Sequence, residues 1–176
     1  ISLLKSIRPE EAEGKVKAVY ENLEAAMGMV PNVLQFQSAS EDVFLRQMDF
    51  LKFIMDHETL SAELMAWIRL IISARKNCDY CIRMNAGMLL RRGFTEDEIK
   101  KGIANPAEVR LSDKEKALLG FVLKIMFEPE KIEEADLDAL REMGWTDKEI
   151  FEASWAGSKQ YGMVQLFKGF KVQLDI

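Results

Sequence analysis

The sequence contains few of the residues that mark several classes of protein. Its 176 residues include only 2 cysteines, 4 prolines, 10 glycines and 1 histidine. Two cysteines are too few for a small scaffold held by disulfides, and so little proline and glycine is unlike a low-complexity chain. With 48% apolar and 30% charged residues, the composition is typical of a globular protein with one sizeable core.

An excess of positive charge is also missing. The chain has 24 lysines and arginines against 29 aspartates and glutamates, and no stretch combines basic with aromatic residues. We therefore expect no nucleic-acid partner. No apolar run approaches the roughly 18 residues of a membrane span, and residues 1–8 are too short and mixed for a signal peptide. The sequence predicts a cytoplasmic protein without a membrane partner.

Helical periodicity dominates the sequence instead. Apolar residues recur every three or four positions from Val16 to Met27, where Gly28 predicts a stop and Pro31 the first residue of the next element. A second apolar stripe runs through 42–57. No segment has the alternation of a β-strand. We predict an all-α, bundle-like single domain over residues 1–176, with roughly seven to nine helices.

Residues 63–74 are apolar on nearly every side, which predicts a central helix surrounded by others. Its exceptions form one stripe: Ala62, Ala66, Arg69, Ser73 and Lys76. Because 115–127 is similarly apolar, we expect part of this apolar area to be left for a partner subunit.

An internal repeat follows the N-terminal helices of 1–59. Residues 60–104 and 111–155 share residues at a constant offset of 51 positions. The matches include Leu60-Ser61 with Leu111-Ser112 and Gly93-Phe94-Thr95-x-x-Glu98 with Gly144-Trp145-Thr146-x-x-Glu149. The glycine predicts a helix end, and the Thr-x-x-Glu pattern, like Ser112-x-x-Glu115, predicts a capping box that opens the next helix. The shared register indicates a duplication. The second copy lacks cysteines and is predicted to be scaffold or a partner surface.

The cysteine pair is the feature with the clearest chemistry. Cys78 and Cys81 lie where the apolar helix ends and another begins, and the free amides of a helix start favour a thiolate. One thiolate can attack a peroxide or disulfide, and the other can then close an intramolecular disulfide. Two inert thiols, or a metal shared between subunits, are the alternatives, since with His57 one chain has too few zinc ligands. We expect no metal and no cofactor.

The segment from Leu60 to Ile99 resembles the alkylhydroperoxidase D-like branch of the carboxymuconolactone decarboxylase superfamily. Its most diagnostic part is Ala74-Arg75-Lys76-Asn77-Cys78-Asp79-Tyr80-Cys81, and Pro31-Asn32-Val33-Leu34 and 111–150 share the resemblance. The resemblance implies an all-helical homo-oligomer with thiol-dependent peroxidase activity. It also implies that Cys81 attacks a hydroperoxide and Cys78 resolves the product, with a dithiol protein as reductant.

The chain departs from the active members of that family at two positions. They carry a histidine four residues after the second cysteine and a glutamate twelve residues before the first, whereas this chain has Asn85 and Ala66. An amide can orient a thiolate but cannot take up its proton, so we expect weak activity. Candidate supporting residues are Asn85, Glu63, His57 and Tyr80. The competing interpretations are an ordinary buried amide for Asn85, a helix-start acid for Glu63 and a helix-end histidine for His57.

Three functions are therefore compatible with the sequence. The first is a peroxiredoxin-like antioxidant enzyme, a thiol-dependent peroxidase or thiol-disulfide oxidoreductase that uses the Cys78 and Cys81 pair. The second is a non-catalytic helical oligomer or partner-binding module, which the missing relay keeps open. The third is a lactone decarboxylase-like enzyme, which has no need of two cysteines.

Overall fold

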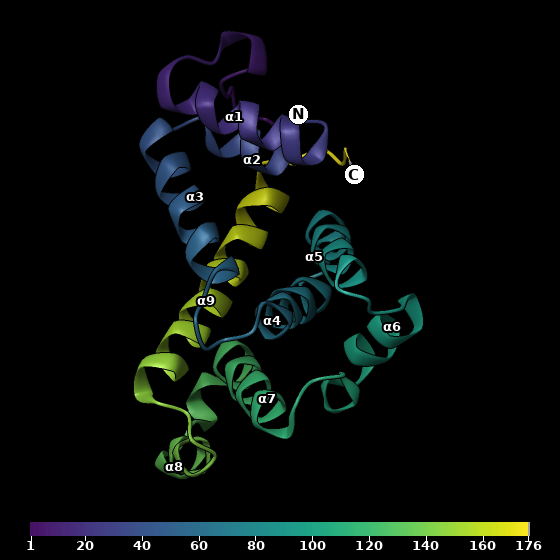
Figure 1. Ribbon diagram of the computed structural model, residues 1–176, viewed down its shortest axis with the longest axis vertical. Helices are drawn as coiled ribbons and strands as arrows, with labels where there is room; N and C mark the ends of the chain where they lie inside the picture. Colours follow the sequence, from purple (N-terminus) through teal and green to yellow (C-terminus); the bar gives the residue numbers. More distant parts are fainter. Residues whose placement is uncertain (176) are drawn as a thin grey trace. The chain divides into compact units, whose positions relative to one another are not determined.

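A computed structural model describes residues 1–175 of the chain. Every regular element in that range is a helix (Figure 1). The α-helices are α1 (Gly14–Met27), α2 (Asn32–Gln37), α3 (Glu41–Met55), α4 (Ala62–Arg75), α5 (Asp79–Arg91), α6 (Glu96–Ala104), α7 (Asp113–Phe127), α8 (Glu134–Glu142) and α9 (Asp147–Gly169). Three short 3-10 helices are η1 (Pro9–Glu11), η2 (Pro106–Glu108) and η3 (Pro129–Lys131). The predicted all-α class and number of helices are confirmed.

The described residues gather into two compact units. One unit contains Ile1–Phe53 together with the C-terminal residues from Gln165 onward, and the other spans Ile54–Val164. Both predicted repeats lie in the second unit. The single-domain description of the whole chain stays a prediction.

In the first unit, α1 buries Val16 and Tyr20 and ends at Gly28. Gly28 has a φ of 77°, a left-handed conformation that favours glycine, and its N–H donates to the carbonyl of Glu24. The predicted helix stop is therefore confirmed. The next helix begins one residue later than predicted, because Pro31 has an extended ψ of 138° and caps α2.

The second unit is built around α4. Every residue from Leu64 to Ser73 is buried, as the apolar pattern predicts. Helices α5, α6 and α7 pack against α4, with α5 on one side and α7 on the other in Figure 1. Because α4 is covered within one chain, the large exposed apolar side chains of this unit lie elsewhere, at Met55, Leu90, Met143, Phe151 and Trp155.

The two repeats share helix boundaries at the offset of 51 residues. Helices α4 and α7 start 51 residues apart, α5 and α8 end 51 residues apart, and α6 and α9 again start 51 residues apart. The predicted capping boxes at Thr95, Ser112 and Thr146 are present, and Glu133 adds one that the sequence did not indicate. The two repeats differ at the start of their second helix. In the second repeat, η3 takes the position that the first turn of α5 has in the first repeat.

We expect Gly157→Ala to destabilise the protein. Its added Cβ would lie 2.7 Å from Val122 Cγ1 of α7 and 3.4 Å from Ile72 Cδ1 of α4. Overpacking of this kind costs about 1–3 kcal/mol of unfolding free energy. The matched control is Gly120→Ala in α7, whose Cβ meets nothing within 4 Å and should gain about 0.5–1 kcal/mol from helix propensity. Denaturant unfolding measures the free energy of unfolding of the two variants. Equal values for the two variants would contradict the close approach of α9 to α7 and α4.

Candidate functional site

The cysteine pair lies at the reversal between α4 and α5. Asn77 has a φ of 52°, a left-handed conformation that asparagine tolerates better than most residues. The chain then turns back, the N–H of Cys78 donates to the carbonyl of Ser73 at 3.0 Å, and Cys78 becomes the residue that caps α5. The predicted position of the pair at a helix start is confirmed.

The two sulfurs are in direct contact. Both cysteines are buried and in the thiol form, and their Sγ atoms are 2.7 Å apart. A disulfide bond of about 2.05 Å therefore needs only a short movement of the sulfurs. The hydrogen bond with Cys78 is the largest cause that raises the pKa of Cys81, followed by burial and the charge of Cys78. Cys81 therefore holds its proton more tightly than an ordinary cysteine does.

Two residues outside the cysteine motif act in the opposite direction. A hydrogen bond from the side chain of Gln160 and the positive charge of Arg69 both lower the pKa of Cys81. Arg69 belongs to the polar stripe on α4, so a charge on an otherwise apolar helix was the signal for it in the sequence. Gln160 lies on α9, far along the chain, and no pattern in the sequence indicated that it belongs to the site.

Asn85 lies one turn after Cys81 but serves the backbone. It is buried, and its Nδ2 donates to the carbonyl oxygen of Cys81 at 2.7 Å. Its Oδ1 is a buried acceptor without a hydrogen-bond partner among the described residues. Ala66 is fully buried in α4, and Tyr80 is buried in the first turn of α5. Of the predicted supporting residues, Asn85 therefore contacts the backbone of Cys81, and Tyr80 is its buried neighbour in the first turn of α5.

Glu63 lies at the opposite end of α5. Its Oε1 accepts a hydrogen bond of 3.0 Å from Arg92, which follows the last residue of α5. Cys81 is in the first turn of the same helix, so about 16 Å of helix separates the two levels. The structure does not bring Glu63 to the sulfurs, and its position in the first turn of α4 matches the helix-start interpretation.

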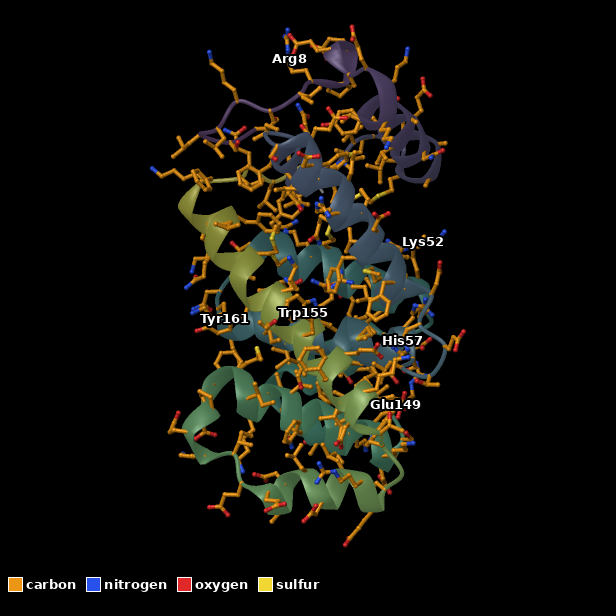
Figure 2. All side chains as sticks on the ribbon, turned by 90° about the vertical axis from the view of Figure 1, so that its left-hand side faces the viewer. Arg8, Lys52, His57, Glu149, Trp155 and Tyr161 are labelled. Atoms are coloured by element: carbon orange, nitrogen blue, oxygen red, sulfur yellow. The ribbon has the colours of Figure 1, made fainter. Side chains whose placement is uncertain are left out.

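His57 precedes α4 and is likewise remote from the pair. Its Nδ1 accepts the backbone N–H groups of Thr59 and Leu60, so Nε2 carries the proton and donates to Glu152 at 2.9 Å. Figure 2 shows His57 close to Glu149 at the start of α9, with Tyr161 farther along that helix.

A different contact is present at the C-terminal end of α4, next to the turn that contains the cysteines. There, Lys76 Nζ donates to Tyr161 Oη at 3.3 Å. The length of α4, about 20 Å, therefore separates His57 from the turn that contains the cysteines.

Two features are missing from residues 1–175: a cluster of metal-ligating side chains and a membrane-spanning helix. No group of three or more His, Cys, Asp and Glu side chains there is arranged as metal ligands would be. None of the helices in that range is long and apolar enough to cross a membrane.

Comparison with known proteins identifies the family of the central segment. Residues 41–124 match the model of the carboxymuconolactone decarboxylase family. That range contains both cysteines and the first helical repeat. This match confirms the resemblance derived from the sequence. No curated protein matches the chain in sequence.

Solved structures share the fold at low sequence identity. The alkylhydroperoxidase AhpD core of a peroxidase-related protein from Ralstonia eutropha JMP134 has a TM-score of 0.85 and 20% identity, covering 99% of this chain and 93% of its own. A peroxidase-related protein from Silicibacter sp. TM1040 has a TM-score of 0.82 and 18% identity, covering 97% of this chain and 87% of its own.

A third similar structure carries a different description. An alanine variant of the debrominase Bmp8, in complex with 2,3,4-tribromopyrrole, has a TM-score of 0.74 and 16% identity. The similarity covers 99% of this chain and 94% of that chain. At these identities the three structures establish the fold that this chain adopts.

We expect mild oxidation to join Cys78 and Cys81 within one chain, because their sulfurs already touch. Mass spectrometry after alkylation would show the loss of two hydrogens and no labelled cysteine. The Cys78→Ser variant is the control, since it retains one thiol and cannot form the bond. Two thiols that stay free under excess peroxide would support the inert interpretation.

Proposed function

We propose that the chain is a thiol-dependent peroxidase in which Cys81 attacks a hydroperoxide and Cys78 resolves the product. The observation that carries this proposal is the buried pair of thiols, 2.7 Å apart at the start of α5. The match of residues 41–124 to the carboxymuconolactone decarboxylase family supports it. The peroxidase-related descriptions of two structures with this fold support it further.

The reaction proceeds in three steps. The Cys81 thiolate attacks the terminal oxygen of the hydroperoxide, the O–O bond breaks, and the alkoxide that leaves takes a proton from water to become an alcohol. Cys81 is now a sulfenic acid. The Cys78 sulfur attacks it, the S–S bond forms, and the S–O bond breaks with release of water. A dithiol protein then supplies two electrons and two protons to restore both thiols.

Neither of the two relay positions holds a side chain that can take a proton from Cys81. Asn85 is bound to a backbone carbonyl, and Ala66 is buried and apolar. General-base assistance contributes about 10²- to 10⁴-fold to a rate, so turnover should be slow.

Debromination is a second candidate because the debrominase Bmp8 shares the fold. Replacing a carbon-bound bromine by hydrogen, with release of bromide, takes up two electrons and one proton. The conversion of a dithiol to a disulfide supplies two electrons as well. A brominated pyrrole therefore belongs in the same assay as an alternative oxidant for the cysteine pair.

Hydroperoxide consumption by the reduced chain tests the proposal. We expect roughly one equivalent to be consumed without a reductant, in line with one dithiol per chain. Cys81→Ser should abolish consumption, whereas Cys78→Ser should react once and leave a sulfenic acid that dimedone traps. The reverse result would assign the attack to Cys78. If neither peroxide nor tribromopyrrole oxidises the wild-type chain, the non-catalytic interpretation is preferred.

We also propose that the chain forms a homo-oligomer. Phe151 and Trp155 are 66% and 49% exposed and stack with ring centroids 6.1 Å apart. Aromatic side chains of this kind are enriched in interfaces. Sedimentation at low concentration should therefore give a mass above the 20.2 kDa of one chain. A compact monomer at all concentrations would contradict the proposal.

A further inference from the structure

We infer that two groups outside the cysteine motif stabilise the Cys81 thiolate: the side-chain amide of Gln160, oriented by Ser73, and the buried guanidinium of Arg69. The inference rests on the proposed function, because it identifies the groups that favour the Cys81 thiolate, in opposition to burial and Cys78, where no base lies beside the sulfur. Both groups are positioning residues, since they act through the sulfur and transfer no proton.

The orientation of Gln160 follows from the hydrogen bonds of Ser73. The hydroxyl of Ser73 has one proton, which it donates to the carbonyl of Arg69 at 2.6 Å. Its oxygen is therefore the acceptor for Gln160 Nε2, which lies 2.9 Å away. This network places the NH₂ group, and not the carbonyl oxygen, on the inner side of the amide. The amide then donates to the Cys81 sulfur, and it lowers the pKa of that thiol as a donor should.

Arg69 is a buried charge without an acidic side chain beside it. Only 7% of its surface is exposed, and among the described residues no carboxylate forms an ion pair with it. Its hydrogen bond goes to Met88 Sδ at 3.5 Å, and a thioether is a weak acceptor. Buried arginines are rarely found unpaired, since burial of a lone charge is costly. A thiolate at Cys81 supplies the missing negative charge.

The protonation states are consistent with this pairing. Burial lowers the pKa of Arg69 to about 10, and the charge of Cys81 raises it, so the guanidinium remains protonated at neutral pH. Other titratable groups near this end of the helices are Arg75 and Lys76 at the end of α4, and Cys78, Asp79 and Tyr80 at the start of α5. Lys76 is bound to Tyr161 of α9. Arg69 is the cation that the structure couples to the sulfur.

Ultraviolet absorbance of the thiolate, followed against pH in a Cys78→Ser background, tests the inference. This background leaves one thiol, so the titration has a single midpoint. Arg69→Met and Gln160→Met should each raise the midpoint by roughly one pH unit, the lower end of the effect of a nearby opposite charge. The thiolate fraction well below the midpoint then falls about tenfold. Arg69→Lys, which keeps the positive charge, should raise the midpoint less than Arg69→Met does.

Arg83→Gln is the matched control, because it removes an exposed charge two residues from Cys81. It should leave the midpoint in place, since water screens that charge. Removal of the unpaired charge by Arg69→Met should not lower the unfolding temperature, whereas a purely structural arginine would lower it and leave the midpoint unchanged.

The inference is overturned if both methionine variants titrate like the parent, or if Arg83→Gln shifts the midpoint equally. The readout does not depend on peroxide turnover. A raised midpoint in a chain that consumes no peroxide would therefore uphold this inference while rejecting the proposed function.

Discussion

An α-helix without a solvent-facing side must be enclosed by other helices, and α4 is such a helix from Leu64 to Ser73. Its enclosure determines how the second unit is packed. Where α6 and α9 approach, the chain has glycines: a Cβ at Gly102 would lie 2.4 Å from the ring of Trp67, and one at Gly157 would meet Val122. Close approach of backbone to buried side chains leaves no room for a larger residue at these positions.

Because α4 is enclosed, its polar residues Arg69 and Ser73 are buried as well. A polar group that is buried needs a partner inside the protein, because it loses its hydrogen bonds to water. Ser73 finds such partners on both sides, in the carbonyl of Arg69 and the amide of Gln160. Arg69 finds only a thioether, and this uncompensated charge lies beside the sulfur of Cys81. The chemistry of the site is therefore concentrated where the core departs from an apolar packing.

The comparisons show that one fold accommodates proteins with different descriptions. At 16–20% identity, the similar structures include peroxidase-related proteins and a debrominase. A fold does not determine a reaction, which depends on the groups placed in the site. In this chain the distinguishing group is a pair of thiols in contact, a donor of two electrons. The second repeat keeps the helix boundaries and carries η3 in place of the thiol turn, which shows that the scaffold exists without the site.

The sequence by itself determined the features that depend on neighbouring residues. Apolar periodicity gave the helices, the capping boxes at Thr95 and Ser112 gave their starts, and the three-residue spacing placed Cys78 and Cys81 in one turn. These features follow from local geometry, since each involves atoms within about one helical turn.

Contacts between distant segments were decided by the tertiary structure. Gln160 reaches Cys81 because α9 packs beside α4. Glu63 binds Arg92, far from the cysteines, because α5 packs antiparallel to α4. His57 is remote for the same reason, held by Glu152 at the other end of α4. A periodic pattern indicates which face of a helix is buried, but not which helix covers it or at what level. The side chains that share a site therefore depend on how the whole chain packs.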